Sequence, residues 1–561
     1  MRTQLHALAL AALLSACATQ PEGTALFSNF TLEATCPAYD TIPLEAEGAY
    51  YNPILPGWNS DPSICRVGTD YYIVTSTFAY FPGVPIYHST DLVNWEQIGF
   101  ALDRPSQLPL EGQSVSHGIW AASISYNPAN KTFYIITTNK DVGNFFVKAK
   151  DPRGPWSDPI MLPDVEGIDP SFFFDTDGRA YIVNDDAPDG PAEYRGHRCI
   201  RFREFDVATD KTIGEGTGRM IVNKGVVPAD EPIWIEGPHI YKIDGTYYLM
   251  CAEGGTKVEH SEVLFRADSV GGPYTPVERN PILTQRDLPD GRPNAVTCTG
   301  HGDLVMTPDS TWYAVFLGCR PCAGWFENMG RETFMMPVRW TENGTPYLTA
   351  PGESVPLRAE VKGASRGSKV TFGNSLYVTD FSDEKLGLGW LSLRGPVDSL
   401  VSLTANPGAL TLVNKGVNTT DKGVPSFVGR RLQHSAFSCS VSMSFVPKAQ
   451  GEMAGLALFK NESHQYLLCA GRDSVGGPVV QVRQVTKENR EGDVLASVPM
   501  ALGPVDLRVS SADGLTFSFA ARPEGEDEWQ TLLEGADASY LSTREAGGFT
   551  GTTIGPFYNA F

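Results

Sequence analysis

Short apolar runs in pairs, separated by polar turns, recur between residues 51 and 350. Each pair is an apolar strand, a turn rich in Asp, Gly, Asn or Pro, and a second strand led by aromatic residues, as in DPSFFFDTDGRAYIVND from Asp169. The pattern occurs five times, and its second strands carry Tyr72, Tyr134, Tyr181, Tyr248 and Tyr313. No window shows a sustained helical period, so the pattern predicts an all-β domain.

Weaker hairpin signals lie between these pairs, for example IYHSTDLVNWEQIG and FVKAKDPRGPWSDPI. Two hairpins per repeat give four strands in about 60 residues, which is the size of a propeller blade. Five repeats therefore predict a five-bladed β-propeller over residues 51–350.

The repeats place several polar residues at equivalent positions. Counting back twelve residues from the later tyrosines, and eleven from Tyr72, reaches Asp61, Ala122, Asp169, Glu236 and His301. Innermost strands line the central channel of a propeller, so we expect the three acids to converge at one mouth of that channel. Because a residue before proline is held extended, Pro62 and Pro170 favour this placement of the first two acids.

Three carboxyl groups crowded in a cleft are unfavourable unless they are used, either for a metal ion or for acid/base chemistry. The chain has no closely packed D-x-D-x-D loop, so a calcium ion would need ligands that only the fold brings together. Two carboxyl groups on opposite sides of a sugar can hydrolyse a glycosidic bond, and a third can raise the pKa of the proton donor. The residues alone leave both uses open.

Several stretches resemble glycoside hydrolase family 43: NPILPGWNSDPSI, STFAYFPGVPIYHSTDLVNW, GIDPSFFFD, WIEGPHIYK and GRETFMMPVRW. The resemblance runs from about residue 50 to 345. Members are five-bladed propellers that act as β-xylosidases, α-L-arabinofuranosidases and arabinanases. It implies an inverting hydrolase that removes terminal or side-chain arabinofuranose or xylose from hemicellulose or its oligosaccharides, and it leaves the choice between the two sugars open.

The resemblance also implies roles for individual residues. Asp61 would be the general base that activates water, Glu236 the general acid, and Asp169 the residue that orients Glu236 and tunes its pKa. Trp120 resembles the aromatic wall of the sugar pocket, with a propeller core residue as the alternative. His301 matches a histidine beneath the sugar that can hold an axial cation, often calcium, with a hydrogen-bonded core histidine as the alternative. No cofactor is otherwise required.

Other side chains suit a sugar pocket by their chemistry. Phe78 and Phe81 could form an apolar side against the CH faces of a pentose, although both would be equally ordinary core residues. Arg331 is a rigid donor for sugar hydroxyls, with a structural ion pair as the alternative. Trp58 and Trp325 could stack at the rim.

Composition changes near residue 351. Residues 351–369 are rich in Pro, Gly and Ser and predict a surface linker. Alternating strands return over residues 370–561 and predict a β-sandwich. LGLGWLSLRGP and FTGTTIGPFYNAF resemble the sandwich of exo-acting relatives, in which a loop helps to close the pocket. A stabilising or carbohydrate-binding module is the alternative.

The N-terminus, MRTQLHALALAALLSACATQ, resembles a bacterial lipoprotein signal. It predicts a signal peptide over residues 1–16, lipidation of Cys17, and a tether over residues 17–50. The protein would then be exported to the periplasm or the outer-membrane surface, touching a membrane only through its lipid; plain secretion is the alternative. Cys319 and Cys322 form a lone CxxC, for which a local disulfide or two free thiols are favoured over zinc.

The net charge of −21 argues against a nucleic-acid partner. The sequence leaves three alternative functions open: a non-catalytic carbohydrate-binding propeller, a retaining fructan-cleaving propeller hydrolase, and a sialidase-type enzyme. For the last, STDLVNW comes near an Asp box but lacks its glycine.

Overall fold

The computed structural model describes residues 23–214, 216–323, 326–364 and 369–561. The predicted signal peptide (1–16), the lipidation site Cys17 and the rim candidate Trp325 lie outside these residues, and their roles stay predictions. None of the helices in the described part of the chain is long and apolar enough to cross a membrane.

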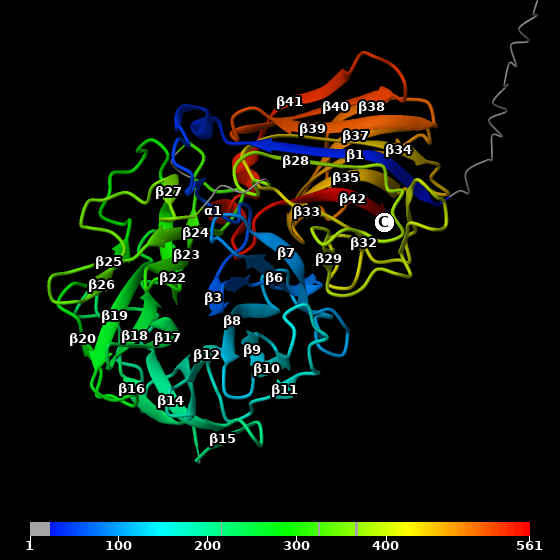
Figure 1. Cartoon of the computed structure of the whole chain (residues 1–561). Coiled ribbons are helices and arrows are strands. Elements are labelled where there is room, and N and C mark those ends of the chain that lie inside the picture. The colour runs from blue at the N-terminus through cyan, green and yellow to red at the C-terminus, as the bar shows by residue number, and fades with distance from the viewer. Residues whose placement is uncertain (1–22, 215, 324–325, 365–368) are drawn as a thin grey trace, which may run out of the picture.

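Five sheets are arranged in a ring, and the five-bladed β-propeller is confirmed (Figure 1). The first blade is β3 (Ser63–Val67), β4 (Asp70–Val74), β6 (Gly83–Ser89) and β7 (Glu96–Leu102). The second is β8 (Ile119–Asn127), β9 (Thr132–Asn139), β10 (Gly143–Ala149) and β11 (Ile160–Met161). The third is β12 (Ile168–Phe174), β13 (Ala180–Asp186), β14 (Cys199–Asp206), β15 (Lys211–Ile213) and β16 (Arg219–Val222).

The last two blades differ in their outer strands. The fourth is β17 (Glu236–Ile243), β18 (Thr246–Glu253), β19 (Ser261–Ala267), β20 (Thr275–Pro276) and β21 (Leu283–Thr284). The fifth has three strands: β22 (Thr297–Met306), β23 (Trp312–Cys319) and β24 (Glu332–Pro337), with the two-stranded β25 (Arg339–Trp340) and β26 (Pro346–Tyr347) following. A bridge from Leu55 to Thr333 of β24 links the N-terminal segment to this blade and so closes the ring.

Each blade has a residue with left-handed backbone within a few residues of the start of its innermost strand. These residues are Asp61 (φ 52°), Ala121 (φ 42°), Asp169 (φ 53°), Gly237 (φ 56°) and His301 (φ 50°). Counting back from the tyrosines therefore missed the equivalent position by one residue in two blades. In the second blade this position is Ala121 and not Ala122, and in the fourth it is Gly237 and not Glu236. Strained backbone of this kind clusters at functional sites. At Gly237 a Cβ atom would lie 2.9 Å from Nε2 of His301, so a larger residue does not fit.

The C-terminal half is a β-sandwich of two antiparallel sheets. One sheet has the order β30 (Val401–Ser402), β31 (Leu410–Leu412), β1 (Ala25–Thr35), β34 (Ala436–Phe445), β39 (Pro504–Ser511), β40 (Thr516–Pro523) and β41 (Gln530–Asp537), with β28 (Ser375–Thr379) paired to β1. The other has the order β32 (Ser426–Phe427), β42 (Thr553–Ala560), β35 (Glu452–Asn461), β36 (His464–Arg472), β37 (Pro478–Val485) and β38 (Asp493–Pro499), with β33 (Arg430–Arg431) paired to β42.

Two predicted connections are wrong in part. Within the predicted tether, β1 is a central strand of the sandwich, because its alternating apolar side chains, including Phe27 and Leu32, are buried in the sandwich core. The 3-10 helix η1 (Pro37–Thr41) follows it. Within the predicted linker, β27 (Arg358–Glu360) pairs with β2 (Ala49–Tyr51), and alternate residues from Val355 to Val361 are buried against the propeller.

Propeller and sandwich share a hydrophobic core. One buried cluster joins Trp58 and Tyr80 of the propeller with Phe427, Phe459 and other residues of the sandwich. Strand β5 (Tyr80–Phe81) pairs with β29 (Ser392–Leu393) across the boundary. This packing fixes the orientation of the two domains.

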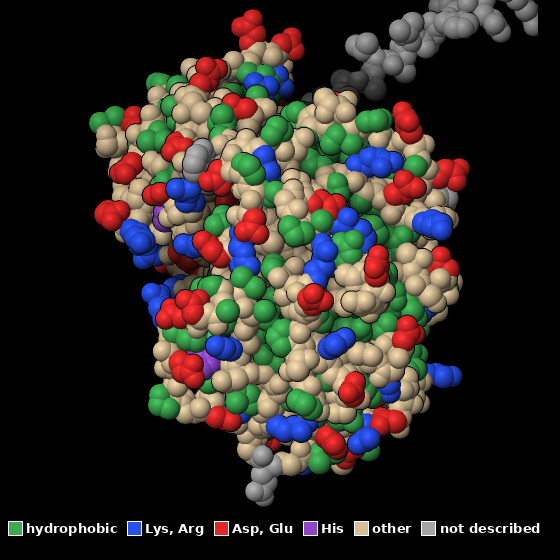
Figure 2. All heavy atoms as spheres, turned by 90° about the vertical axis from the view of Figure 1, so that its left-hand side faces the viewer, with side chains coloured by type: hydrophobic (Ala, Val, Ile, Leu, Met, Phe, Trp, Pro, Cys, Tyr) green, Lys and Arg blue, Asp and Glu red, His purple; other side chains and the backbone are tan. Residues whose placement is uncertain are grey.

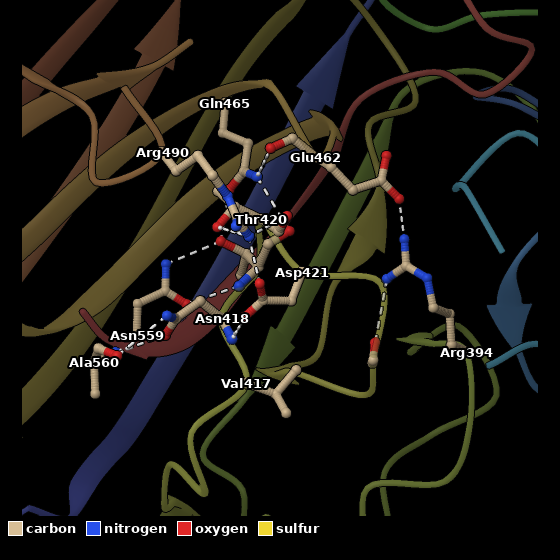
Figure 3. A network of polar contacts seen from close by, with 12 residues as sticks. Arg394, Val417, Asn418, Thr420, Asp421, Glu462, Gln465, Arg490, Asn559 and Ala560 are labelled. Atoms are coloured by element: carbon tan, nitrogen blue, oxygen red, sulfur yellow. Dashed lines mark hydrogen bonds and ion pairs between the residues drawn. The ribbon is translucent and has the colours of Figure 1, made fainter. Parts of the chain in front are cut away.

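A buried ion pair reinforces the same boundary. Arg394 pairs with Glu462 at the sandwich side (Figure 3). Nε of Arg394 donates to the carbonyl of Gln113 at 2.6 Å, and Oε1 of Glu462 accepts from the amide of Val115 at 2.9 Å. The pair therefore holds the propeller loop that leads into Trp120.

Candidate active site

One small pocket, of about 70 Å³, collects most of the side chains that the sequence singled out. It is lined by Asp61, Phe78, Trp120, Ala121, Ile168, Asp169, Glu236, Thr256, His301, Arg331 and Phe549. The three acids are thus neighbours, although more than 170 residues separate the first from the last in the chain. Each stands at or just before the start of an innermost strand, as the repeats predicted.

Asp61 lies among cations and donors. Its carboxylate is 3.3 Å from Nη1 of Arg331 and 4.0 Å from Nδ1 of His301, and it accepts a hydrogen bond of 2.6 Å from Ser76. Burial alone would raise its pKa, but Arg331, His301 and Ser76 together outweigh burial and hold the pKa below its usual value. Asp61 is therefore a carboxylate at neutral pH and able to accept a proton.

Glu236 has the opposite surroundings. It is only 9 % exposed. Burial, and then the negative charges of Asp169 and Asp185, raise the pKa of Glu236 well above its usual value. Glu236 therefore keeps its proton where Asp61 has lost its own, and two carboxyl groups in one pocket differ in protonation state.

Asp169 is attached to the backbone beside Glu236. Its Oδ2 accepts a hydrogen bond of 3.3 Å from the amide of Gly237. Burial raises the pKa of Asp169, and the charge of Asp61 adds to this effect, while His301 opposes it. Asp169 thus holds the backbone next to Glu236, and its negative charge raises the pKa of Glu236.

Sequence reasoning missed Asp185. Its side chain is fully buried, forms an ion pair with Arg198 and accepts a hydrogen bond of 2.6 Å from Nε of that residue. The charge of Asp185 contributes to the raised pKa of Glu236. An acid at the end of the apolar run AYIVND was a usable signal, because a charged group in a buried strand needs a partner or a purpose.

Aromatic side chains form one wall of the pocket. Phe549, from the sandwich, stacks on Phe78 with ring centroids 6.1 Å apart and meets Trp120 edge-on at 5.6 Å. The guanidinium of Arg331 lies 5.1 Å from the same ring. The sequence identified Phe78, Trp120 and Arg331, whereas Phe549 was missed as an individual residue within the motif FTGTTIGPFYNAF.

A short segment of the sandwich carries Phe549. It begins at η2 (Ala538–Leu541) and α1 (Thr543–Ala546) and runs to β42. The amide of Phe549 donates to Ser116 at 2.9 Å, and the carbonyl of Ser116 accepts from Nε1 of Trp120 at 2.9 Å. Ser116 therefore couples the sandwich segment to the propeller wall.

Two aromatic candidates lie outside the pocket, and the CxxC has one of its expected forms. Phe81 is buried in the propeller core and Trp58 in the shared core, and neither is among the residues that line the pocket. Both fill space that blade packing and the domain boundary require. Trp325 stays untested. Cys319 and Cys322 are free thiols, one of the two favoured alternatives.

The resemblance suggests that a calcium ion binds on the propeller axis, and the side chains there decide whether it can. A cavity of about 10 Å³, which shares Asp61, Asp169 and His301 with the pocket, is also lined by Ser63, Ser123 and His239. Calcium takes six to eight oxygen ligands. The side chains here offer two carboxylates and two hydroxyls, and the Asp61 carboxylate is already held by Arg331 and Ser76. In residues 23–214, 216–323, 326–364 and 369–561, no group of three or more His, Cys, Asp or Glu could hold a metal ion. These side chains alone do not fit calcium, which stays a prediction.

Comparisons with known proteins agree with this geometry. Residues 50–346 match the family model of glycosyl hydrolases family 43, and residues 378–560 match that of the β-xylosidase C-terminal concanavalin A-like domain. A non-reducing-end α-L-arabinofuranosidase of Bacteroides ovatus is 38 % identical over 519 residues, covering 91 % of this chain and 92 % of that protein. A xylosidase/arabinosidase of Butyrivibrio fibrisolvens is 39 % identical over 516 residues, covering 90 % and 94 %.

Solved structures extend the match to the whole fold. A family 43 subfamily 12 protein from a capybara gut metagenome is 42 % identical, with a TM-score of 0.87 over 95 % of this chain and 99 % of that one. A xylan β-1,4-xylosidase of Bacillus halodurans is 35 % identical, with a TM-score of 0.81 over 91 % of this chain and 97 % of that one.

Proposed function

Because the chain belongs to glycosyl hydrolases family 43, we propose that it is an inverting, exo-acting glycosidase that releases α-L-arabinofuranose or β-D-xylose from hemicellulose or its oligosaccharides. The observation that carries this proposal is the contrast between Asp61 and Glu236. One has a lowered pKa and the other a raised pKa within the same pocket.

The proposed reaction is a single displacement. Asp61 takes a proton from a water molecule, and the oxygen of that water attacks the anomeric carbon. Glu236 gives its proton to the leaving glycosidic oxygen as the bond to the anomeric carbon breaks. Water attacks from the face opposite to the leaving group, so the released sugar has inverted configuration. Asp169 acts as a positioning residue, through the amide of Gly237 and through its charge on Glu236.

The pocket wall supports exo action on a small sugar. Phe549 closes the pocket on the sandwich side, and the cavity is small, which favours a chain end or a single side-branch sugar over the middle of a polymer. Phe78, Trp120 and Phe549 offer apolar faces to the CH groups of a pentose. Arg331 lines the pocket, so its guanidinium is a rigid donor suited to a sugar hydroxyl.

The test is hydrolysis of 4-nitrophenyl β-D-xyloside and 4-nitrophenyl α-L-arabinofuranoside, with the anomer of the released sugar followed by proton NMR. We expect at least one substrate to be cleaved with inversion. Asp61→Asn should lose about 10²–10⁴-fold in kcat on it, and Glu236→Gln should lose a comparable factor on xylobiose or an arabino-oligosaccharide, whose leaving group needs a proton. Glu204→Gln, at an exposed propeller carboxyl, is the control. Retention of configuration, wild-type rates of Asp61→Asn on the pentosides, or wild-type rates of Glu236→Gln on the oligosaccharide would refute the mechanism.

A further inference from the structure

A second cavity, larger than the acid-lined pocket, lies on the sandwich. Its volume is about 320 Å³, and its wall includes Asn29, Ser440, Ser442, Asp506, Arg522 and Trp529. These residues come from β1, β34, β39, β40 and the turn before β41. In Figure 1 these strands form the part of the sandwich turned away from the propeller, far from β12 and β17.

The alternation of side chains along β34 and β39 makes the face that lines this cavity polar. Along β34, Cys439, Val441 and Met443 enter the sandwich core, so Ser440 and Ser442 face the other side of the sheet. Asp506 stands in the same way between the buried Val505 and Leu507 of β39. The outer face of these strands is therefore lined with short hydrogen-bonding side chains.

The polar groups of this cavity are held in place by one another. Asp506 is only 8 % exposed, accepts from Ser442 at 2.7 Å through Oδ1, and accepts from Nε of Arg522 at 2.9 Å through Oδ2. Nδ2 of Asn29 donates to Ser442 at 3.4 Å. Each carboxylate oxygen keeps a second lone pair for another donor. Such a preorganised set loses little entropy when it binds a ligand.

Asn29 is displaced from the regular strand pattern. It lies in a β-bulge of β1, between Ser28 and Thr31, and its φ is 52°. A bulge re-aims a side chain, and asparagine is one of the few residues other than glycine that readily adopt left-handed backbone. The bulge exposes Asn29 at the cavity while the neighbouring Phe30 stays in the core.

Trp529 supplies an aromatic surface. Its indole lines the cavity and is half-buried. The guanidinium groups of Arg508 and Arg522 lie 4.3 Å and 4.4 Å from a ring centroid of the indole, and these contacts fix its position. A fixed aromatic ring beside planar amide, carboxylate and guanidinium groups matches a sugar, which has both CH faces and hydroxyl pairs.

Charges at the cavity balance. Asp506 and Glu524 oppose Arg522 and Arg508, so the site favours an uncharged ligand over an anion or a cation. A volume above about 300 Å³ lies in the range of ligand pockets. We propose that this cavity is a second carbohydrate-binding site, which binds a neutral pentose-based oligosaccharide segment of the polymer. The choice of a pentose polymer rests on the proposed function.

The experiment measures retention of the full chain on insoluble arabinoxylan at 4 °C. We expect Trp529→Ala and Asn29→Gly to weaken retention at least fivefold, while rates on both 4-nitrophenyl pentosides stay within twofold of wild type. Glycine suits the backbone at position 29, so the second variant keeps the bulge. Trp340→Ala removes an exposed indole from the propeller and should not change retention.

The outcomes separate this site from the catalytic proposal. Retention unchanged in both variants, equal loss in Trp340→Ala, or no retention of the wild type would overturn the binding site. If neither pentoside is cleaved but both variants still lose retention, the proposed catalytic function fails and the binding site stands. Unchanged pentoside rates in the variants, where the wild type is active, show that the fold is intact.

Discussion

At the scale of single residues, the neighbours of Asp61 and Glu236 shift the pKa values of these two carboxyl groups in opposite directions. Asp61 is surrounded by Arg331, His301 and Ser76, whereas Glu236 is buried next to Asp169 and Asp185. A carboxyl group near cations stays ionised, and a buried carboxyl group near anions stays protonated. The proposed base and acid therefore follow from position, and two predictions address them.

The first prediction concerns the leaving group. A 4-nitrophenolate leaves without needing a proton, whereas a sugar alkoxide needs one. Glu236→Gln should therefore lose much more activity on xylobiose or an arabino-oligosaccharide than on the matching 4-nitrophenyl glycoside. Asp61→Asn should lose similar factors on both, because water must be activated in each case. Steady-state kcat/KM on the paired substrates checks this, and equal losses in Glu236→Gln would contradict the proposed acid.

The second prediction concerns pH. Activity requires protonated Glu236, so the alkaline limb of kcat/KM follows its raised pKa. Removing a neighbouring negative charge lowers that pKa, so Asp169→Asn should move the alkaline limb to lower pH, in addition to reducing the rate. The pH profile of kcat/KM for wild type and variant is the measurement. A limb that stays in place would show that Asp169 acts only by positioning.

At the scale of elements, the start of each innermost strand sets the direction of the site residues. A residue with left-handed backbone lies near the start of the innermost strand in all five blades. In the fourth blade that residue is Gly237, so Glu236 lies one position earlier. The second determining element is the sandwich segment around Phe549, which belongs to the wall of a pocket built otherwise by the propeller.

The prediction at this scale is that Phe549→Ala weakens substrate binding. It removes the ring that packs on Phe78 and Trp120 beside the proposed sugar position. We expect KM to rise about tenfold, about 1.4 kcal/mol, with a smaller change in kcat, because the ring contacts ground and transition states alike. Phe561→Ala, at an exposed phenylalanine, is the control. An unchanged KM would remove Phe549 from the binding wall.

At the scale of the whole molecule, the two domains act as one unit because they share a core and a buried ion pair. The side chain of Arg394 is fully buried and that of Glu462 is 18 % exposed (Figure 3). Elsewhere the surface is mixed: on the face in Figure 2, acidic and basic side chains are interspersed, so the net charge of −21 does not gather there into one acidic patch.

We predict that Glu462→Gln destabilises the protein. It leaves the Arg394 charge buried without its partner, and breaking a buried pair in this way costs about 3–5 kcal/mol. Glu491→Gln is the matched control, because Glu491 is 46 % exposed in its pair with Arg483 and should change stability by less than about 1 kcal/mol. Urea unfolding measures both. Equal stabilities of the two variants would show that the Arg394 pair does not secure the domain boundary.

Three features were missed by sequence reasoning: the strand β1, Phe549 and Asp185. The segment ALFSNFTLEAT alternates as a strand should, but the bulge at Asn29 breaks the period, and its partners lie more than 300 residues away. The tether prediction failed for that reason. Phe549 and Asp185 were missed similarly, because their importance depends on contacts with other blades or with the other domain.

The sequence by itself determined the all-β class, the five blades, the sandwich and the three acids of the pocket. It could do so because local hydrophobic periods and repeats act over a few residues and recur along the chain. Only the tertiary structure decided the place of β1, the closure of the pocket by Phe549, and the opposite pKa shifts of Asp61 and Glu236. These depend on burial and on distances between residues far apart in the chain, which no local pattern encodes.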